Sequence, residues 1–256
     1  MKGLWLLTAM TISALSLAQQ STGQVGPTDR GREEKTSVGA LQLYGPGGPL
    51  GPMRECGQVF SKKTGIDVQI TTGTPPQWIE LAQQNGDLIF EGAEYMLNDF
   101  MRSAPGMINE SSIIGLYARS AAILVRKGNP KRIATLEDLA RDGVKVMVVT
   151  QEKMEEVYGH VPGIQYNVVK PVLTGAEATQ IWKTMPELDA WITYESWFHT
   201  LKEEADLIQL TAKERILRIT PVARIGTLRD KKLAEEFLNF LRSDEAHRIF
   251  QKWGWK

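Results

Sequence analysis

The chain has 256 residues, with 30 basic and 30 acidic side chains and a formal net charge of zero. This even balance, without long runs of one charge, argues against a nucleic-acid-binding protein. The length suffices for one large domain or two smaller lobes with a substantial core. The single cysteine, Cys56, cannot form an intramolecular disulfide, so we expect it to be a small buried side chain.

The first 18 residues have the features of a secretory signal peptide. Lys2 precedes an apolar run from Leu4 to Leu17, and Ser16 and Ala18 occupy the positions that signal peptidase reads. The run is shorter than the roughly 20 residues that span a bilayer, so we favour cleavage after Ala18 over a membrane anchor. Residues 19–37 are polar without apolar periodicity and predict a flexible linker.

Alternating strands and helices follow the linker. Three strand-to-helix junctions fall within about 60 residues, which is typical of a parallel α/β sheet. Thr74 and Gln77 form a T-x-x-Q capping box at one helix start, and Gly65 terminates the first helix. The predicted elements are strands over 40–44, 67–71 and 87–90, and helices over 53–64, 75–86 and 94–101.

The second half of the chain begins with a long extended segment, 113–126, which is predicted to cross between lobes. A second segment, 216–225, is predicted to cross back before two closing helices. Thr135 is the expected N-cap of a helix, and Thr174 with Glu177 repeats the capping-box pattern. The other predicted elements are helices over 135–142, 174–182, 231–243 and 244–255, a strand over 144–149, and a strand, turn and helix over 188–197.

Enzyme signatures are missing from the sequence. The three histidines, His160, His199 and His247, lack metal-ligand spacing, and there is no G-x-S-x-G, P-loop or H-E-x-x-H motif. The sequence therefore points to no catalytic residue, metal or cofactor, and we expect a protein that is not an enzyme.

A short polar or glycine-rich turn recurs where a strand ends and a helix begins. It occurs at Gly45–Gly48, Gly73–Thr74, Gly92–Ala93 and near Tyr194. The first backbone N–H groups of a helix lack partners and favour negative charge, and such turns converge at the carboxyl ends of parallel strands. The pattern predicts an anion site built largely from backbone. A plain tight turn is the alternative interpretation of the glycine-rich stretch.

Six stretches also resemble one family of exported proteins. They are "LYGPGGP", "GTPPQW", "DLIFEGAEYMLNDF", "AAILVRKGNP", "DAWITYESW" and "FLNFLRSDEAHRIFQKWGW". On these stretches the chain from Ala40 onward resembles type 2 periplasmic solute-binding proteins, within them the accessory colonization factor (AcfC-like) group, relatives of the molybdate- and sulfate-binding proteins. The resemblance implies two α/β lobes, each a mostly parallel sheet flanked by helices, joined by two crossing strands. The predicted lobes are 38–119 with 222–256, and 120–221.

The resemblance also implies a function and a set of ligand-binding residues. A small anion, either a sulfate- or molybdate-like oxyanion or a small carboxylate, is held between the lobes in the periplasm and passed to the permease of an ABC transporter. Tyr194 is the position from which oxyanion binders of this class offer a phenolic hydroxyl. The expected ligand-binding residues are Gly47, Gly48, Gly73, Thr74, Trp78, Gly92, Ala93, Glu94, Thr150, Gln151 and Tyr194.

One loop departs from the family pattern. After Val149 the chain reads "TQEKMEEVYGHVPG", where the group carries a loop with glycine and glutamine before a helix. Glu155 and Glu156 would repel an anion if they faced inward. Two alternatives stay open: an interaction factor that presents its closed form to a chemoreceptor or a host surface, and a periplasmic enzyme on the same scaffold. We expect a monomer.

Overall fold

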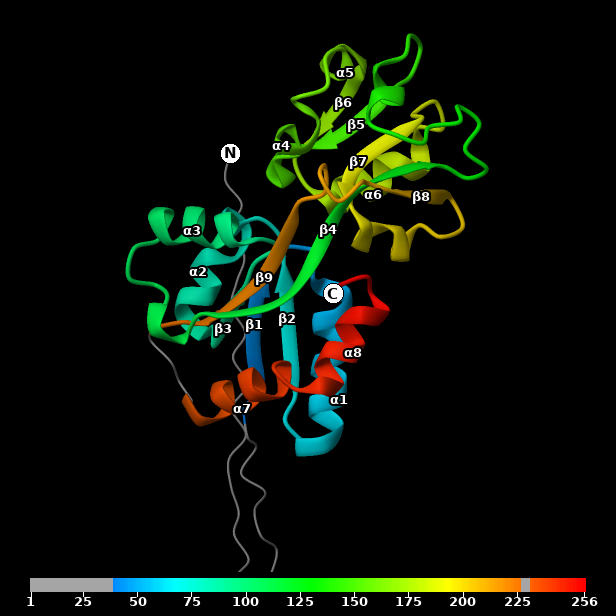
Figure 1. The fold of residues 1–256 in the computed structure, drawn as a ribbon. Helices are drawn as coiled ribbons and strands as arrows, with labels where there is room; N and C mark the ends of the chain where they lie inside the picture. Colours follow the sequence, from blue (N-terminus) through cyan, green and yellow to red (C-terminus); the bar gives the residue numbers. More distant parts are fainter. Residues whose placement is uncertain (1–38, 227–230) are drawn as a thin grey trace, which may run out of the picture. The chain divides into compact units, whose positions relative to one another are not determined.

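The computed structural model describes residues 39–226 and 231–256 (Figure 1). Residues Val38–Lys256 group into one compact unit. The predicted signal peptide, 1–18, and linker, 19–37, lie outside the described residues. Within the described ranges, no helix is both long and apolar enough to cross a membrane.

The first group of strands forms three successive strand-helix units, as predicted. The central strand β1 pairs in parallel with β2 on one side and β3 on the other. A helix follows each strand, and Gly65 ends the first helix in the left-handed conformation, with φ 77°. The elements are β1 (Leu41–Gly45), α1 (Leu50–Thr64), β2 (Val68–Thr72), α2 (Pro75–Asn85), β3 (Leu88–Phe90) and α3 (Glu94–Ser103).

The second group of strands has the same parallel arrangement around β5. This strand pairs in parallel with β6 and β7, and α6 follows β6. The sequence did not predict β6 or β8. The elements are β5 (Val146–Val149), η3 (Thr150–Glu152), α4 (Glu155–Tyr158), α5 (Ile164–Asn167), β6 (Val168–Val172), α6 (Gly175–Thr184), β7 (Ala190–Tyr194), η4 (Glu195–Thr200) and β8 (Ala205–Gln209).

Two long antiparallel strands, β4 (Ile114–Arg126) and β9 (Leu217–Arg224), belong to both groups. β9 pairs with β3, and β4 pairs with β7 and β8, so the strand order is β2-β1-β3-β9-β4-β7-β5-β6. Figure 1 shows both strands running from one group to the other. The two crossing segments and the α/β fold class predicted from the sequence are therefore confirmed.

The pairing between β4 and β9 contains a bulge. Gly115 pairs with Pro221 and Ala118 with Ile219, so that two residues of β4 lie opposite one residue of β9, Thr220. An extra residue of this kind bends the strand and changes which side chains face which side of the sheet. The bulge lies in the stretch of β4 that joins the two groups of strands.

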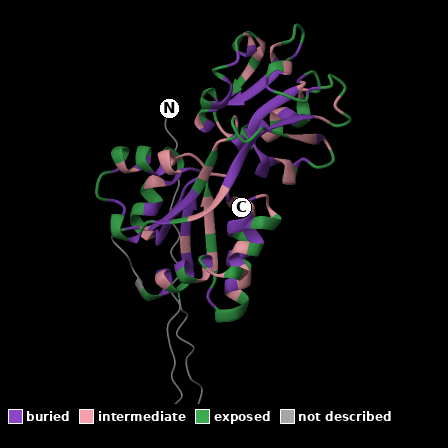
Figure 2. Cartoon of the chain, in the orientation of Figure 1, coloured by how far each residue is buried: buried purple, intermediate pink, exposed green. Residues whose placement is uncertain are grey.

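The core consists of three apolar clusters. Alternation along β1 sends Leu41 and Leu43 into the first cluster with α1, α7 (Lys231–Leu241) and α8 (Asp244–Lys252). Tyr44 points to the opposite face, into the second cluster with α2 and α3. The third cluster draws its buried residues from Ala121 to Leu210. Figure 2 shows the inner strands largely buried, the edge strand β2 partly exposed and the outer faces of the helices exposed.

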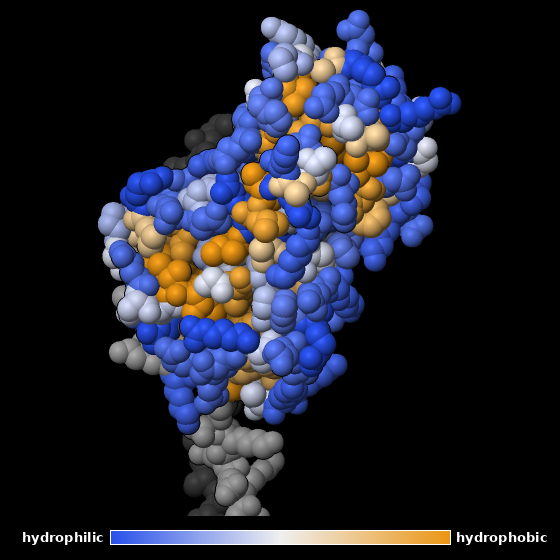
Figure 3. Space-filling model, viewed as in Figure 1, coloured by the Kyte–Doolittle hydropathy of each residue, from blue (hydrophilic) through white to orange (hydrophobic). Residues whose placement is uncertain are grey.

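Cys56 is fully buried in the first cluster, as expected. Some large apolar side chains nevertheless stay exposed, including Leu217 and Ile219 of β9. On the face drawn in Figure 3, hydrophobic residues gather along the middle and hydrophilic residues surround them.

The predicted helix over 135–142 was wrong. The chain forms only a short 3-10 turn there, η2 (Glu137–Ala140), as it does at η1 (Glu110–Ser112). The Asp138 carboxylate accepts hydrogen bonds from the amides of Ala134 (2.7 Å) and Thr135 (3.1 Å). These bonds hold the acid against the backbone before the turn, and the chain leaves helical geometry at Arg141, where φ is −66° and ψ is 143°.

Candidate functional site

A cavity of about 200 Å³ lies where the loops of both strand groups meet. The first group contributes the turns after its three parallel strands, with Gly47 and Gly48 after β1, Gly73 and Thr74 after β2, and Gly92 after β3. These five predicted residues are therefore brought together. The carboxyl ends of parallel strands meet at one edge of a sheet, which explains why turns far apart in the sequence line one cavity.

The second group closes the same cavity from its own strand ends. Gln151 and Glu152 follow β5, Thr174 and Gly175 follow β6, and Trp197 follows β7. Of these residues the sequence had singled out only Gln151 as a ligand contact. The remaining lining residues are Pro46, Thr72, Gln77, Met96, Arg119, Val149 and Ala176.

Arg119 of β4 is the cation of this cavity. The residue is only 2% exposed, and its Nε donates a hydrogen bond of 3.1 Å to the carbonyl oxygen of Gly92. Its guanidinium carbon lies 3.8 Å from the centroid of the Tyr194 ring, a cation–π contact. The Nη1 atom is buried without a hydrogen-bond partner among the described residues. An unpaired donor on a buried charge is costly, so an anionic acceptor in the cavity would stabilise it.

Two glycines leave the space that this guanidinium occupies. A Cβ at Gly48 would lie 3.0 Å from Nη1 of Arg119, and a Cβ at Gly92 would lie 2.7 Å from Nη2. A Cβ at Gly175 would lie 2.1 Å from the Trp197 ring. Larger residues at these positions would displace the side chains that line the cavity, which gives the glycine-rich turns a physical role beyond tight turning.

Among the residues that the structure describes, backbone amides without a partner are found at one cavity-lining turn in each strand group. The amides of Gly48, just before α1, and Gly175, the first residue of α6, donate to no other described residue. The Gly73 amide, in contrast, donates to Gly45 at 3.0 Å, and the Thr74 amide donates to Gln77 Oε1 at 2.7 Å. The amides of the second turn therefore form hydrogen bonds within the loop and in the predicted capping box, and neither is left for a ligand.

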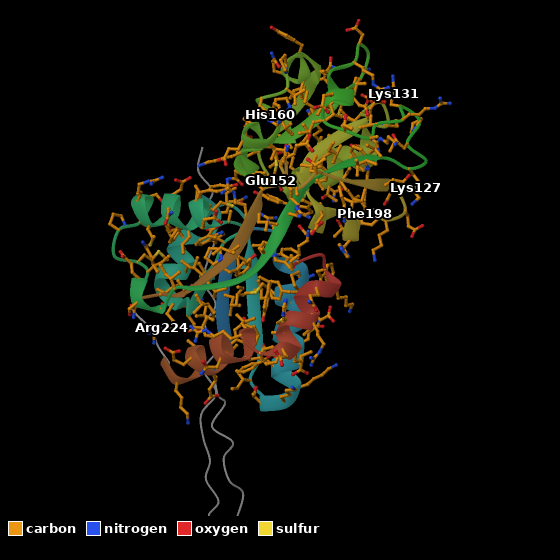
Figure 4. The ribbon with its side chains drawn as sticks, viewed as in Figure 1. Lys127, Lys131, Glu152, His160, Phe198 and Arg224 are labelled. Carbon is orange, nitrogen blue, oxygen red and sulfur yellow. The ribbon has the colours of Figure 1, made fainter. Side chains whose placement is uncertain are left out.

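Glu152 brings a buried carboxylate to the cavity lining, and it is 6% exposed. Its Oε1 accepts a hydrogen bond of 2.7 Å from Trp197 Nε1, and its Oε2 accepts one of 2.6 Å from Thr193 Oγ1. Burial raises the pKa of Glu152 above its ordinary value, and the nearby charge of Arg119 and the two hydrogen bonds offset only part of this rise. Figure 4 labels Glu152 where the second strand group meets β4 and β9.

The two carboxylates that the sequence marked as possible sources of repulsion do not line the cavity. Glu155 and Glu156 are exposed in α4, and Glu156 forms an ion pair with Arg218 of β9. The other end of the Arg218 guanidinium pairs with Glu94 of α3 at 2.9 Å. The loop after β5 thus turns these acids outward and places Glu152 inward instead.

Five of the predicted ligand-binding residues lie outside the lining of this cavity: Thr150, which lines a neighbouring cavity, and the four residues that follow. Trp78 is 2% exposed in the second cluster, where its Nε1 donates to the carbonyl of Gly73 at 3.2 Å and its ring stacks on Phe100. Ala93 is a buried residue at the start of α3. The other two are Glu94, in the ion pair with Arg218, and Tyr194, fully buried beneath Arg119.

A second cavity of about 450 Å³ adjoins the first. Thr150 lines this cavity, and Tyr95 donates a hydrogen bond of 2.9 Å to the carbonyl of Gln151 at its edge. Glu91 also lines it; burial raises the pKa of this carboxyl to about 8. The lining residues common to both cavities are Pro46, Gly73, Thr74, Met96 and Gln151.

A family model described as bacterial extracellular solute-binding protein matches residues 41–256. The chain belongs to this family. No curated protein sequence matches the chain.

Solved structures extend the comparison for this solute-binding protein. Peb3 from Campylobacter jejuni is similar at 27% sequence identity, with a TM-score of 0.74, covering 84% of this chain and 99% of that chain. A structure of L-phospholactate-bound PEB3 gives 26% identity and a TM-score of 0.75 over the same shares. The predicted resemblance to the AcfC-like group is confirmed by this match.

Two more distant structures share the fold alone. The sulfate-binding protein SubI from Mycobacterium tuberculosis is 18% identical, with a TM-score of 0.68, covering 85% of this chain and 86% of that one. The periplasmic molybdate-binding protein of Azotobacter vinelandii is 14% identical, with a TM-score of 0.66, covering 84% and 98%. Both support the type 2 periplasmic binding protein fold of this solute-binding protein.

Arg119, Glu152 and Trp197 of this solute-binding protein were not predicted from the sequence as ligand contacts. A signal for Arg119 was present, because a charged residue between Ala118 and Ser120 interrupts an otherwise apolar crossing strand. Glu152 carried no such signal, since three further glutamate and lysine residues follow it within four positions. Within the described part of the chain, no cluster of three or more histidine, cysteine or acidic residues is arranged to hold a metal.

Proposed function

We propose that this protein captures a small, oxygen-rich anion in the cavity beside Arg119 and delivers it to the membrane permease of an ABC transporter. The observation that carries the proposal is the Nη1 atom of Arg119, which is buried at the cavity without a hydrogen-bond partner among the described residues. A charge-assisted hydrogen bond to an anion contributes about 1.5–3 kcal/mol, more than a neutral hydrogen bond. A ligand oxygen at this position completes the coordination of the guanidinium.

Capture between two lobes follows from how the cavity is built. We assign residues 38–119 with 222–256 to one lobe and 120–221 to the other. The separation of the third apolar cluster from the first two supports this division, as do the two crossing strands. Because both strand groups line the cavity, a ligand that contacts both stabilises the closed arrangement over an open one.

The relatives narrow the chemistry of the ligand. PEB3 has been solved with L-phospholactate and SubI is a sulfate-binding protein, so phosphate-bearing acids and tetrahedral oxyanions are the first candidates, followed by small carboxylates. As family members act outside the cytoplasm, we place the protein in the periplasm as a monomer, with its signal peptide cleaved after Ala18. We assign it no catalytic role and no cofactor.

A thermal-shift screen of the ligand-stripped protein, produced from residue 19 onward, tests the proposal. The screen uses phosphate, sulfate, thiosulfate, molybdate, tungstate and small di- and tricarboxylates, with chloride at matched ionic strength as control. A ligand at a hundredfold its dissociation constant stabilises by about 2.7 kcal/mol, or roughly 5–10 °C for a protein of this size. No shift with any anion, in protein shown to be folded, would overturn anion capture and favour an interaction role such as chemoreceptor binding.

A further inference from the structure

Glu152 is an unexpected group to find at an anion-binding cavity. Of the residues that line the cavity, Arg119 and Glu152 carry charge, one of each sign. A carboxylate beside a bound anion repels it unless a hydrogen atom lies between the two oxygens. The arrangement therefore favours an anion that carries a hydrogen atom which it can donate to Glu152.

The hydrogen bonds made by Glu152 hold its carboxylate as an acceptor. The indole of Trp197 can only donate, so Oε1 of Glu152, 2.7 Å away, must accept. Thr193 donates to the other oxygen at 2.6 Å. Each carboxylate oxygen keeps one further lone pair after these bonds, which is available to a donor on the ligand.

Burial raises the pKa of Glu152 above its ordinary value. The Arg119 guanidinium, which faces the carboxyl from β4, and the hydrogen bonds from Thr193 and Trp197 oppose this rise and favour the ionised acceptor. The other titratable groups that face it are the phenols of Tyr95 from α3 and Tyr194 from β7; burial raises the pKa of both, so both are neutral at physiological pH. The carboxylate thus has one cationic neighbour, which the ligand anion shares.

We infer that Glu152 selects anions that carry their own hydrogen-bond donor, as hydrogen phosphate and singly protonated phosphate monoesters do, over fully deprotonated oxyanions such as sulfate and molybdate. The inference rests on the proposed capture of an anion at Arg119. The ligand's charged oxygens pair with Arg119 and the free amides of Gly48 and Gly175, and its P–OH donates to Glu152. Sulfate has the same tetrahedral shape and no proton to donate, so the pocket discriminates by protonation.

Isothermal titration calorimetry at pH 6.5 with inorganic phosphate, sulfate and molybdate tests this selection. We expect the wild-type protein to bind phosphate at least tenfold more tightly than sulfate or molybdate. Glu152→Gln should reduce this ratio at least tenfold and gain sulfate affinity, because the amide oxygen still accepts from Trp197 while the amide nitrogen donates to the oxyanion. Glu155→Gln removes an exposed carboxylate three positions away that does not line the cavity, and it should keep the wild-type ratio.

Each contrary outcome has a distinct meaning. Equal wild-type affinity for phosphate and sulfate, or an unchanged ratio in folded Glu152→Gln, overturns the selection by Glu152 while leaving anion capture in place. If Glu152→Gln does not fold, the ratio of phosphate affinity to sulfate affinity in the wild-type protein decides whether the pocket selects protonated anions. If the protein does not bind phosphate, the selection by Glu152 is overturned. If it binds none of the anions, the proposed capture function is overturned as well.

Discussion

The guanidinium of Arg119 stacks 3.8 Å above the ring centroid of Tyr194, with its Nη1 atom facing the cavity. The ring packs against one face of the guanidinium, so a shorter polar side chain without the charge should affect the ligand more than the fold. We expect Arg119→Gln to weaken binding of the anion found in the ligand screen by about tenfold to a hundredfold, which corresponds to the loss of one charge-assisted hydrogen bond. Calorimetry measures the change.

A matched control for this prediction is Arg102→Gln. Arg102 lies in α3 and its side chain is 75% exposed, so the variant removes one positive charge without touching the cavity. Its affinity should stay within about twofold of the wild type, since exposed charges contribute little at physiological ionic strength. An equal loss in both variants would mean that general electrostatic attraction, and not the Arg119 contact, drives binding.

Gly48→Val should abolish ligand binding while leaving the fold largely intact. The added Cβ would lie 3.0 Å from Arg119 Nη1, and the two methyl groups would fill the space in which a ligand oxygen meets that nitrogen. Gly39→Val is the control, because a Cβ at Gly39 meets nothing within 4 Å. Circular dichroism reports the fold and calorimetry the affinity; retained binding in Gly48→Val would remove this turn from the site.

Glu91 should make the protein less stable as the pH rises. Burial raises its pKa from 4.5 to about 8, so the folded state keeps a proton that the unfolded state releases above pH 4.5. Stability is thus lost between pH 4.5 and 8, at up to about 1.4 kcal/mol per pH unit. Glu91→Gln removes this proton linkage, and we expect it to be more stable than the wild type at pH 8, by up to about 4–5 kcal/mol, with the difference shrinking toward zero at pH 4.5.

Urea denaturation at pH 4.5, 6 and 8 measures the effect of Glu91→Gln. Glu110→Gln, at an exposed position of η1, is the control and should follow the wild type at every pH. A stability difference between Glu91→Gln and the wild type that stays constant over the three pH values would show that the carboxyl is ionised in the folded protein.

Arg218 should tune affinity without contacting the ligand. From β9 it pairs with Glu94 of α3 in one strand group and with Glu156 of α4 in the other, so it favours the arrangement in which both groups line the cavity. We expect Arg218→Gln to weaken ligand binding about threefold to tenfold, because partly exposed ion pairs contribute about 0–1 kcal/mol each. The wild-type affinity should fall in the same direction when the salt concentration is raised.

Lys63→Gln is the control for Arg218. It breaks a comparable ion pair, with Glu245, that joins α1 to α8 on the first strand group alone. Its ligand affinity should match the wild type. A similar loss of affinity in both variants would indicate a general effect of charge on the protein, and an unchanged affinity in Arg218→Gln would show that this pair does not stabilise the ligand-binding arrangement.

The repeating pattern of the first strand group could be read from the sequence because each element carried its own local signal. The strand at 41–45 alternates, Gly65 stops α1, and Thr74 with Gln77 starts α2. The strands β6 and β8 were missed because their local sequences carry no such signal and their pairing depends on distant partners, β5 and β4. The helix predicted from Thr135 did not form, because the chain makes only the 3-10 turn Glu137–Ala140 and becomes extended at Arg141.

The residues of the candidate site could likewise be predicted only where they carried a local sequence signal. Glycines at strand ends were recognisable, and the structure gathers Gly47, Gly48, Gly73 and Gly92 at one cavity. Arg119 was not singled out, although its charge interrupts the crossing strand, because only the assembled loops of both strand groups make it part of a cavity. Trp78 was proposed as a ligand contact because it follows a loop, whereas its indole stacks on Phe100 in the core.

The bulge in β4 determines on which face of the sheet Arg119 lies, and so whether the cavity has its cation. Side chains of a strand alternate between its two faces, and the extra residue between Gly115 and Ala118 reverses this alternation for everything after it. A β4 one residue shorter would carry the same arginine on the opposite face of the sheet, turned away from the cavity. One extra residue thus determines on which face of a continuous strand the Arg119 side chain lies.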